Sequence, residues 1–208
     1  MQHVSVIETP VVKDALTYLR NCKTDTKTFR FYAETISYEL LSAALRIGDM
    51  RQMSITTPLA QMQGKVLDTH FVFITIFRAG LAMLPAALRV FPGSGIGFVG
   101  LKRDELTAIA NEYYVHLPNI TSQTTVLLAD PMLATGGSML SAIEKISKYQ
   151  PKEIRIVSVI CAPEGIKAVH KKFPDVKIFT AAVDNYLNDK KYIVPGLGDF
   201  GDRYFATT

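Results

Sequence analysis

The fold of this chain is decided at residues 125–138, where the sequence reads Thr-Val-Leu-Leu-Ala-Asp-Pro-Met-Leu-Ala-Thr-Gly-Gly-Ser. An apolar run suited to a buried strand leads into a carboxylate, then a loop of small residues, then an amphipathic helical pattern. Backbone N–H groups of such a loop, with the amino terminus of the following helix, can cradle a phosphate. We expect Asp130 to accept a hydrogen bond from a sugar hydroxyl. We expect Gly136 and Gly137 to supply close backbone approach or positive φ, and Gly137 in particular to resist a β-branched replacement for that reason.

Outward from this loop, short apolar runs alternate with helical patterns from residue 70 onwards. The predicted strands are Phe71–Phe77, Ile96–Val99, Thr125–Ala129, Ile154–Cys161 and Val176–Ala182. The predicted helices lie around residues 81–90, 137–149 and 164–173. Nearly continuous apolar strands are typical of a parallel sheet buried on both faces. The sequence therefore predicts an α/β fold with helices on both sides, and ligands bound beyond the carboxyl ends of the strands.

The flanking segments depart from this alternation. The amino-terminal part is predicted to be helical, because apolar residues recur at spacings of three and four between Phe29 and Ile47. Residues 53–69 look irregular, with Pro58 and Gly64 as breakers.

Two further segments are polar or rich in glycine. Residues 101–124 are long and mixed in character, which predicts a flap or protruding hairpin. The tail, residues 184–208, carries several glycines and predicts a folded loop rather than a strand or helix.

Composition excludes several classes of function. The 208 residues carry a net charge of +4, which suits an anionic ligand, but no basic stripe interleaved with aromatic residues indicates nucleic-acid binding. The pairs Lys171-Lys172 and Lys190-Lys191 are expected on solvated faces. No apolar run is long enough to span a bilayer, no leader pattern is visible, and the two cysteines, expected to pack as small hydrophobes, have no metal-like spacing. We expect a cytoplasmic protein.

Two arginines stand near strand ends and are candidate ligands of an anion. Arg78 follows the first predicted strand and precedes Ala79-Gly80, whose backbone can face the same anion. Arg103 follows the strand that is predicted to end near Val99. A guanidinium offers a planar fork of donors that matches pyrophosphate oxygens.

These motifs together resemble those of the uracil phosphoribosyltransferases, members of the type I phosphoribosyltransferase superfamily. The loop at Asp130-Pro131 looks like that family's variant of a signature in which many relatives have two adjacent acids. Arg78 and its neighbours are similar to the family's pyrophosphate loop, although Thr75-Ile76-Phe77 stands where Pro-Ile-Leu is frequent. The tail from Tyr192 to Asp202 resembles the uracil-recognition loop, with Phe200 where many bacterial members have alanine.

The resemblance implies a site in which 5-phosphoribosyl-1-pyrophosphate (PRPP) reacts with uracil to give UMP and pyrophosphate. The implied catalytic residues are Arg78, Arg103, Asp130 and Asp199. The implied PRPP-binding residues are Arg78, Ala79, Gly80, Arg103, Asp130, Pro131, Met132, Leu133, Ala134, Thr135, Gly136, Gly137, Ser138 and Asp199. The implied uracil contacts are Ile193, Gly198, Asp199 and Phe200.

It also implies Mg²⁺ carried by PRPP, with no metal site built by the protein itself, and a homodimer or higher homo-oligomer. The expected organisation is one phosphoribosyltransferase domain over 1–208, with a helical part at 1–50, an α/β core at 70–183 and a base-binding hood at 184–208. Two alternatives stay open: a type I phosphoribosyltransferase for another base, and a non-enzymatic regulator of the same fold that binds PRPP or RNA.

Overall fold

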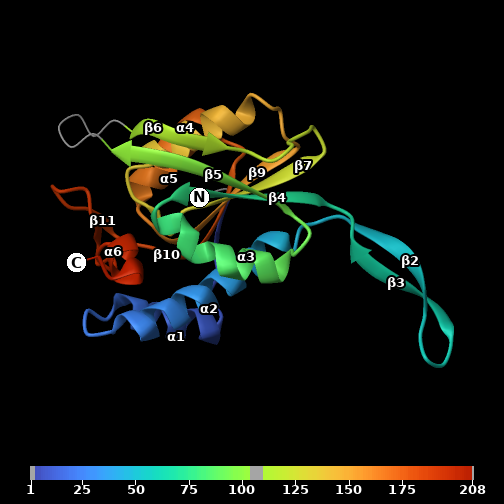
Figure 1. Ribbon diagram of the computed structural model, residues 1–208. Helices are drawn as coiled ribbons and strands as arrows, with labels where there is room; N and C mark the ends of the chain where they lie inside the picture. Colours follow the sequence, from blue (N-terminus) through green and yellow to red (C-terminus); the bar gives the residue numbers. More distant parts are fainter. Residues whose placement is uncertain (1–2, 104–109, 208) are drawn as a thin grey trace.

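The computed structural model describes residues 3–103 and 110–207, and its centre is a mainly parallel sheet (Figure 1). The strands are β1 (Val4–Val6), β4 (His70–Phe77), β5 (Gly95–Arg103), β6 (Ala110–His116), β7 (Thr124–Ala129), β9 (Glu153–Cys161) and β10 (Lys177–Val183), with the short β8 (Met132–Leu133) beside β9. They are ordered β1-β10-β9-β7-β4-β5-β6. All neighbouring pairs are parallel except β5 and β6. The five predicted strands are confirmed, and they are neighbours in the sheet.

Helices cover both faces of this sheet (Figure 1). On one face lie α1 (Pro10–Arg20), α2 (Thr26–Leu45) and α3 (Leu84–Val90), and on the other α4 (Gly137–Ser147) and α5 (Pro163–Lys172). A hydrophobic core lies on each face of the sheet, and alternate residues of β4 point into one or the other. Phe71 and Phe73 pack on the α1–α3 side, whereas Val72 and Ile74 pack on the α4–α5 side. Burial on both faces explains why the strand carries no apolar–polar alternation. The predicted α/β class is confirmed.

The prediction that residues 53–69 are irregular is wrong. They belong to an antiparallel hairpin of β2 (Met50–Thr56) and β3 (Gln61–Leu67), which projects from the body as an arm (Figure 1). Pro58 lies in the turn between the strands, and Gly64 lies inside β3 opposite Met53. Most residues of both strands are exposed. Without a buried face, the sequence has no alternation to indicate a strand.

The tail also differs from the prediction of a loop. It contains the short paired strands β11 (Tyr186–Leu187) and β12 (Ile193–Val194), and then a helix, α6 (Phe200–Phe205). The helix is stabilised at its start, because the Asp199 carboxylate accepts a hydrogen bond from the Asp202 N–H at 2.9 Å. Its first residue, Phe200, is 1% exposed and packs edge-to-face on Phe29. A buried aromatic residue thus fixes the tail to α2.

β5 is longer than predicted and reaches Arg103, where it pairs with β6 across a bulge after Gly100. Part of the predicted flap, residues 104–109, lies outside the described residues. Cys161 is buried as expected, but Cys22 is exposed. No helix within residues 3–103 and 110–207 is long and apolar enough to cross a membrane.

Candidate functional site

The predicted phosphate loop leaves the sheet at the carboxyl end of β7 and leads into α4. Its first residue, Asp130, is tied to the neighbouring strand, because its carbonyl accepts a hydrogen bond from the Ser158 hydroxyl at 2.6 Å. The Asp130 carboxylate accepts one from the Met132 N–H at 3.2 Å. These contacts fix the carboxylate at the point where the chain turns away from the sheet.

The middle of the loop is held by β9. The Pro131 carbonyl accepts hydrogen bonds from the N–H groups of Val159 and Ile160, and the Leu133 carbonyl accepts one from Ala162. Pro131 itself is buried and does not line the cavity described below. Its main chain therefore supports the loop from the sheet side.

The glycine that takes positive φ is Gly136, with φ +85°, and not Gly137. A Cβ atom on Gly136 would lie 3.2 Å from the Gly165 carbonyl oxygen and 3.3 Å from Ala168 Cβ. Gly137 is the first residue of α4, and a Cβ there would meet only Thr135 Oγ1, at 3.7 Å. The expectation that Gly137 requires positive φ is therefore wrong, and that requirement belongs to its neighbour.

Close packing behind the loop involves a residue to which the sequence assigned no part in phosphate binding. A Cβ atom on Gly165, in the first turn of α5, would lie 2.4 Å from the Ala134 carbonyl oxygen and 2.9 Å from that of Leu133. A side chain at this position would therefore displace the loop. The sequence shows only a glycine in a helix start, so this role could not be inferred without the fold.

The second loop follows β4 and forms the 3₁₀ helix η1 (Ala79–Met83). A Cβ atom on Gly80 would lie 2.3 Å from Thr75 Oγ1 and 2.8 Å from the Ala129 carbonyl oxygen. The absence of a side chain thus lets η1 lie directly against β4 and β7. This contact brings Ala79 to the wall of the same cavity as the phosphate loop.

The Arg78 guanidinium is held by the tail. It donates hydrogen bonds to Asp202 Oδ1 at 2.5 Å and to Thr207 Oγ1 at 3.2 Å. Hydrogen bonds from the Thr207 hydroxyl and from Arg78 lower the pKa of Asp202, so this carboxylate is ionised at neutral pH. The sequence assigned Asp202 no role. The sequence does show a carboxylate near the end of the tail motif. It does not show that this carboxylate binds Arg78, because Arg78 lies 124 positions earlier in the chain.

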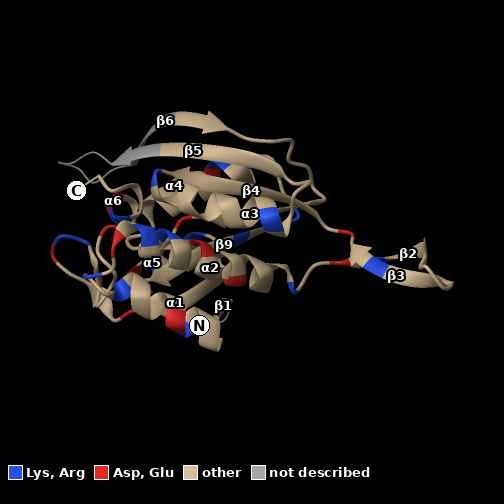
Figure 2. Cartoon of the chain, turned by 60° about the horizontal axis from the view of Figure 1, so that its bottom comes forward, with Lys and Arg blue, Asp and Glu red and all other residues tan. Residues whose placement is uncertain are grey.

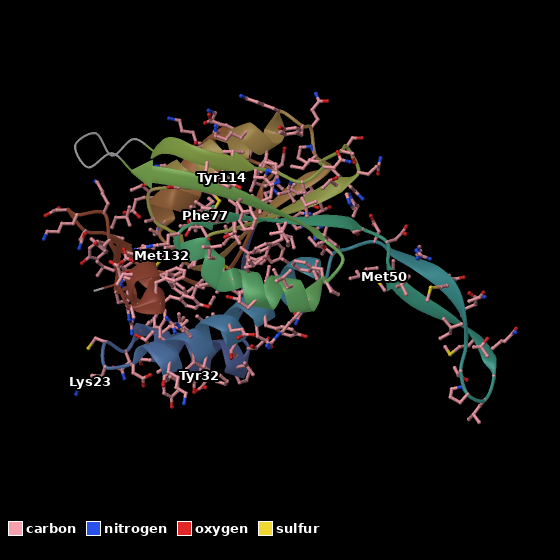
Figure 3. The ribbon with its side chains drawn as sticks, viewed as in Figure 1. Lys23, Tyr32, Met50, Phe77, Tyr114 and Met132 are labelled. Atoms are coloured by element: carbon pink, nitrogen blue, oxygen red, sulfur yellow. The ribbon has the colours of Figure 1, made fainter. Side chains whose placement is uncertain are left out.

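The phosphate loop, Ala79 and the tail meet around one open cavity with a volume of about 310 Å³. Its walls come from segments far apart in the sequence: Ala79, Asp130, Met132, Leu133, Ala134, Thr135, Gly136, Gly137, Ser138, Met139, Lys190, Lys191, Tyr192, Gly198, Asp199, Phe200 and Gly201. Met132 is labelled in Figure 3, between the sheet and the tail. A cavity with a helix amino terminus on one wall and a glycine-rich turn on another suits a ligand with a phosphate at one end.

Some predicted site residues lie apart from the cavity walls. Ile193 is 4% exposed and lies in the apolar core, and neither Arg78 nor Gly80 is on the cavity wall, although Ala79 between them is. Phe200 lines the cavity although the residue is only 1% exposed. The Arg103 side chain lies outside the described residues.

Lys190 and Lys191 depart from the interpretation given to them. They are exposed, as expected of a solvated pair, but they also line the cavity, together with the phosphate loop. They add positive charge near a site that carries the carboxylates Asp130 and Asp199. Figure 2 shows basic segments of the tail beside α5 and α6. Only the fold distinguishes this pair from Lys171-Lys172, which lies at the end of α5.

The described residues provide few candidate ligands for a metal ion at this cavity. Among residues 3–103 and 110–207, no group of three or more His, Cys, Asp or Glu side chains is arranged to hold one. The cavity offers the carboxylates Asp130 and Asp199. Such a small set fits a Mg²⁺ ion that takes most of its ligands from substrate phosphates and water.

Comparisons with known proteins show which family and which fold this chain resembles. A family model described as uracil phosphoribosyltransferase matches residues 6–207. A protein of Rhodococcus jostii with that name is 43% identical over 208 residues, which cover all of both chains. The solved structure of the AQ2163 protein from Aquifex aeolicus has a TM-score of 0.93 and 36% identity, and covers 99% of each chain. An orotate phosphoribosyltransferase from Mycobacterium tuberculosis, at 12% identity and a TM-score of 0.53, covers 88% of this chain and 97% of its own; it shares the fold.

Proposed function

Because the chain belongs to the uracil phosphoribosyltransferase family, we propose that it transfers the phosphoribosyl group of PRPP to uracil and releases pyrophosphate, forming UMP. The observation that carries the proposal is the shared cavity. The phosphate loop at 132–138 and the tail turn at 198–201 both line it, so one ligand bound by the loop lies within reach of another bound by the tail.

The ribose phosphate would occupy the loop end of the cavity. Backbone N–H groups between Thr135 and Ser138 stand at the amino terminus of α4, where the helix dipole favours an anion. Asp130 would accept hydrogen bonds from the ribose hydroxyls at the other side of the loop. This arrangement holds the sugar by its phosphate and by its diol, leaving C1 directed along the cavity.

Uracil would lie against the tail turn. It presents two carbonyl acceptors and an N3–H donor, which main-chain groups at Gly198 and Phe200 can match. Asp199 would face PRPP or its metal ion. A main-chain pattern of donors and acceptors rejects cytosine, because cytosine exchanges a donor for an acceptor and leaves buried groups unpaired.

The reaction is a displacement at ribose C1. The bond from C1 to the pyrophosphate oxygen breaks as uracil N1 bonds to C1 from the opposite face, and the uracil N1 proton is lost to solvent. Negative charge grows on the pyrophosphate as it leaves, and Arg78 and Arg103 would stabilise it. Asp130 and the phosphate loop hold the ribose so that most of the rate enhancement comes from positioning and electrostatics.

A Mg²⁺ ion bound to PRPP would neutralise pyrophosphate charge, and Asp130 and Asp199 are the carboxylates on the cavity wall. The cytoplasm is the expected compartment for this chemistry. The proposed organisation is one catalytic domain, in which the helical part, the α/β core and the hood form a single unit.

The arm formed by β2 and β3 supports a homodimer or higher homo-oligomer. Five large apolar side chains on it are exposed: Met50, Met53, Leu59, Met62 and Leu67. Figure 3 shows its side chains projecting away from the body of the molecule, with Met50 labelled at its start. From Gln52 to Gly64 the arm has no charged residue. An isolated two-stranded ribbon is marginally stable in water, so a second copy of the chain would cover it.

One assay tests the function directly. UMP formation from labelled uracil and PRPP with Mg²⁺ is measured beside cytosine, orotate and hypoxanthine. We expect turnover of uracil and little or none of the others. Preferred turnover of orotate or hypoxanthine would assign the chain to another base, and binding of PRPP with no turnover of any base would favour the non-enzymatic alternative.

A further inference from the structure

A partly buried ion pair, Arg20–Asp184, lies next to the tail turn at Gly196. Asp184 stands just past the carboxyl end of β10 and is 7% exposed. Its carboxylate accepts hydrogen bonds from both terminal nitrogens of Arg20, at 2.5 Å and 2.9 Å. Arg20 is the last residue of α1, so the pair joins two elements that are 164 positions apart in the sequence.

The same pair holds the main chain of Gly196. The Gly196 N–H donates to Asp184 Oδ2 at 2.9 Å, and the Gly196 carbonyl accepts from an Arg20 terminal nitrogen at 2.8 Å. Gly196 has φ +62°, and a Cβ atom on it would lie 2.1 Å from the Ile193 carbonyl oxygen. Both polar groups of this tight turn are therefore satisfied by the ion pair, and the turn admits no side chain.

A second arginine holds the next residue. Arg203, in α6, donates to the Leu197 carbonyl at 2.7 Å, and its guanidinium lies over the Phe29 ring at 4.4 Å from the centroid. It also donates to the carbonyl oxygens of Leu19 and Asn21 at the end of α1. Two consecutive carbonyls of the turn, at 196 and 197, are thus each bound by an arginine that also contacts another part of the protein.

The residues that follow this support are Gly198, Asp199 and Phe200, which line the cavity. A site that recognises a base through its main chain has no side-chain rotamer with which to select a ligand. Its discrimination depends on how firmly the donors and acceptors are held, because a loop that shifts can pair with the wrong base.

We propose that Arg20 and Asp184 are positioning residues that set base selectivity by fixing the turn at Gly196, without touching either substrate. The inference rests on the proposed function, in which 198–200 recognises uracil. It assigns a role in recognition to an ion pair that would otherwise serve only to join α1 to β10.

The test compares three variants with a matched control. Arg20→Gln removes the charge and the paired hydrogen bonds. Arg20→Lys keeps the charge but cannot bind the two Asp184 oxygens and the Gly196 carbonyl with one planar group. Asp184→Asn keeps the shape and one acceptor. The control is Lys172→Gln, which removes one positive charge from an exposed ion pair with Glu144, remote from the cavity.

The measurements are KM for uracil, KM for PRPP, kcat, the rate ratio of uracil to cytosine, and the thermal midpoint. We expect Arg20→Gln to raise KM for uracil by roughly tenfold or more, the size expected for losing hydrogen bonds to a charged group. Its uracil-to-cytosine ratio should fall, while KM for PRPP changes by less than about twofold. Arg20→Lys should recover part of both losses, and the control should match the parent protein.

A merely structural ion pair gives a different result. It would lower the thermal midpoint while leaving KM for uracil and the base ratio of the folded protein unchanged, and that outcome overturns the proposal. If Asp184→Asn fails to fold, the two Arg20 variants alone test whether the ion pair sets base selectivity. Failure of the proposed function would be seen separately, in the unsubstituted protein, as a preference for a base other than uracil. In that case the KM for the preferred base and the rate ratio of that base to cytosine would be measured in the same variants.

Discussion

Substituting Gly136 by alanine, with Gly137→Ala as the matched control, tests the account of the phosphate loop most sharply. The two glycines are adjacent, both line the cavity, and both substitutions add one methyl group. They differ in conformation, since Gly136 has φ +85° and Gly137 has the ordinary φ of a helix start.

The magnitude follows from the backbone and from the space around it. A residue with a Cβ atom pays about 1–2 kcal/mol to adopt the left-handed conformation. The added atom at 136 would also press on the Gly165 carbonyl oxygen and Ala168 Cβ, at 3.2 Å and 3.3 Å. We therefore expect Gly136→Ala to lower the free energy of unfolding by about 2 kcal/mol or more. Gly137→Ala should leave it unchanged or raise it by about 0.4–1 kcal/mol, because alanine restricts the unfolded chain.

Chemical denaturation measures the stability change, and calorimetry without uracil measures PRPP affinity. The distorted loop of Gly136→Ala should bind PRPP at least about tenfold more weakly, since several amides then point away from the phosphate. Gly137→Ala should lose less affinity. If Gly137→Ala is the more destabilised variant, or if Gly136→Ala binds PRPP like the parent protein, then positive φ at 136 is not what shapes the cradle.

Three other predictions concern charge. Arg78→Ala should lower kcat/KM by roughly 10²-fold. Its thermal midpoint should fall only slightly, because the ion pair that it loses with Asp202 is largely exposed. Asp202→Asn should lower kcat/KM less, because the arginine remains but loses a charged partner. Near-normal kinetics for Arg78→Ala would remove Arg78 from the mechanism. Replacing Lys190 and Lys191 together by alanine should raise KM for PRPP at low ionic strength. The difference in KM between the variant and the parent protein should shrink as salt is added. A salt-independent difference would argue against an electrostatic role. Burial raises the pKa of Glu153, but hydrogen bonds from Arg155 and Lys177 outweigh this and hold the pKa below its usual value. Its stabilising contribution is therefore present above about pH 4.3, the pKa of an unfolded glutamate, and is lost as the pH falls through the folded-state pKa; Glu153→Gln should flatten the acid side of the stability profile, and an unchanged profile would contradict this.

The parallel sheet could be predicted from the sequence because its signals are local. Each central strand is an apolar run bounded by polar residues, and burial on both faces makes that run nearly continuous, as in β7 with all of its residues buried. The phosphate loop was visible for the same reason: strand, carboxylate, glycines and helix follow one another without interruption. The family resemblance added the substrates, which no run of residues indicates by itself.

The arm and α6 could not be predicted because no local sequence pattern marks them. The strands of the arm bury little within the chain, so they lack the period-two pattern by which a strand is recognised. α6 is too short to show a helical period. It forms because Asp199 caps it and because Phe200 inserts against Phe29, a contact between residues 171 positions apart (200 − 29).

Prediction of the site from the sequence has the same limit, since contacts between distant parts of the chain cannot be inferred from local patterns. Many of the residues that line the cavity could be named from the sequence, because glycines, a carboxylate and hydroxyls that lie close together in one loop indicate a binding site by themselves. The residues that hold those groups in place were not. Arg20 is an ordinary basic residue at a helix end until β10 brings Asp184 beside it, and Asp202 is one acid among several until α6 turns it towards Arg78. Both pairs bridge the tail to a distant part of the chain, and their geometry depends on the whole fold. Under the proposed function, in which the main chain at 198–200 recognises the base, its selectivity depends on how rigidly that segment is held. Substitutions at Arg20 and Asp184, which spare the predicted contacts, should therefore still change the choice of base.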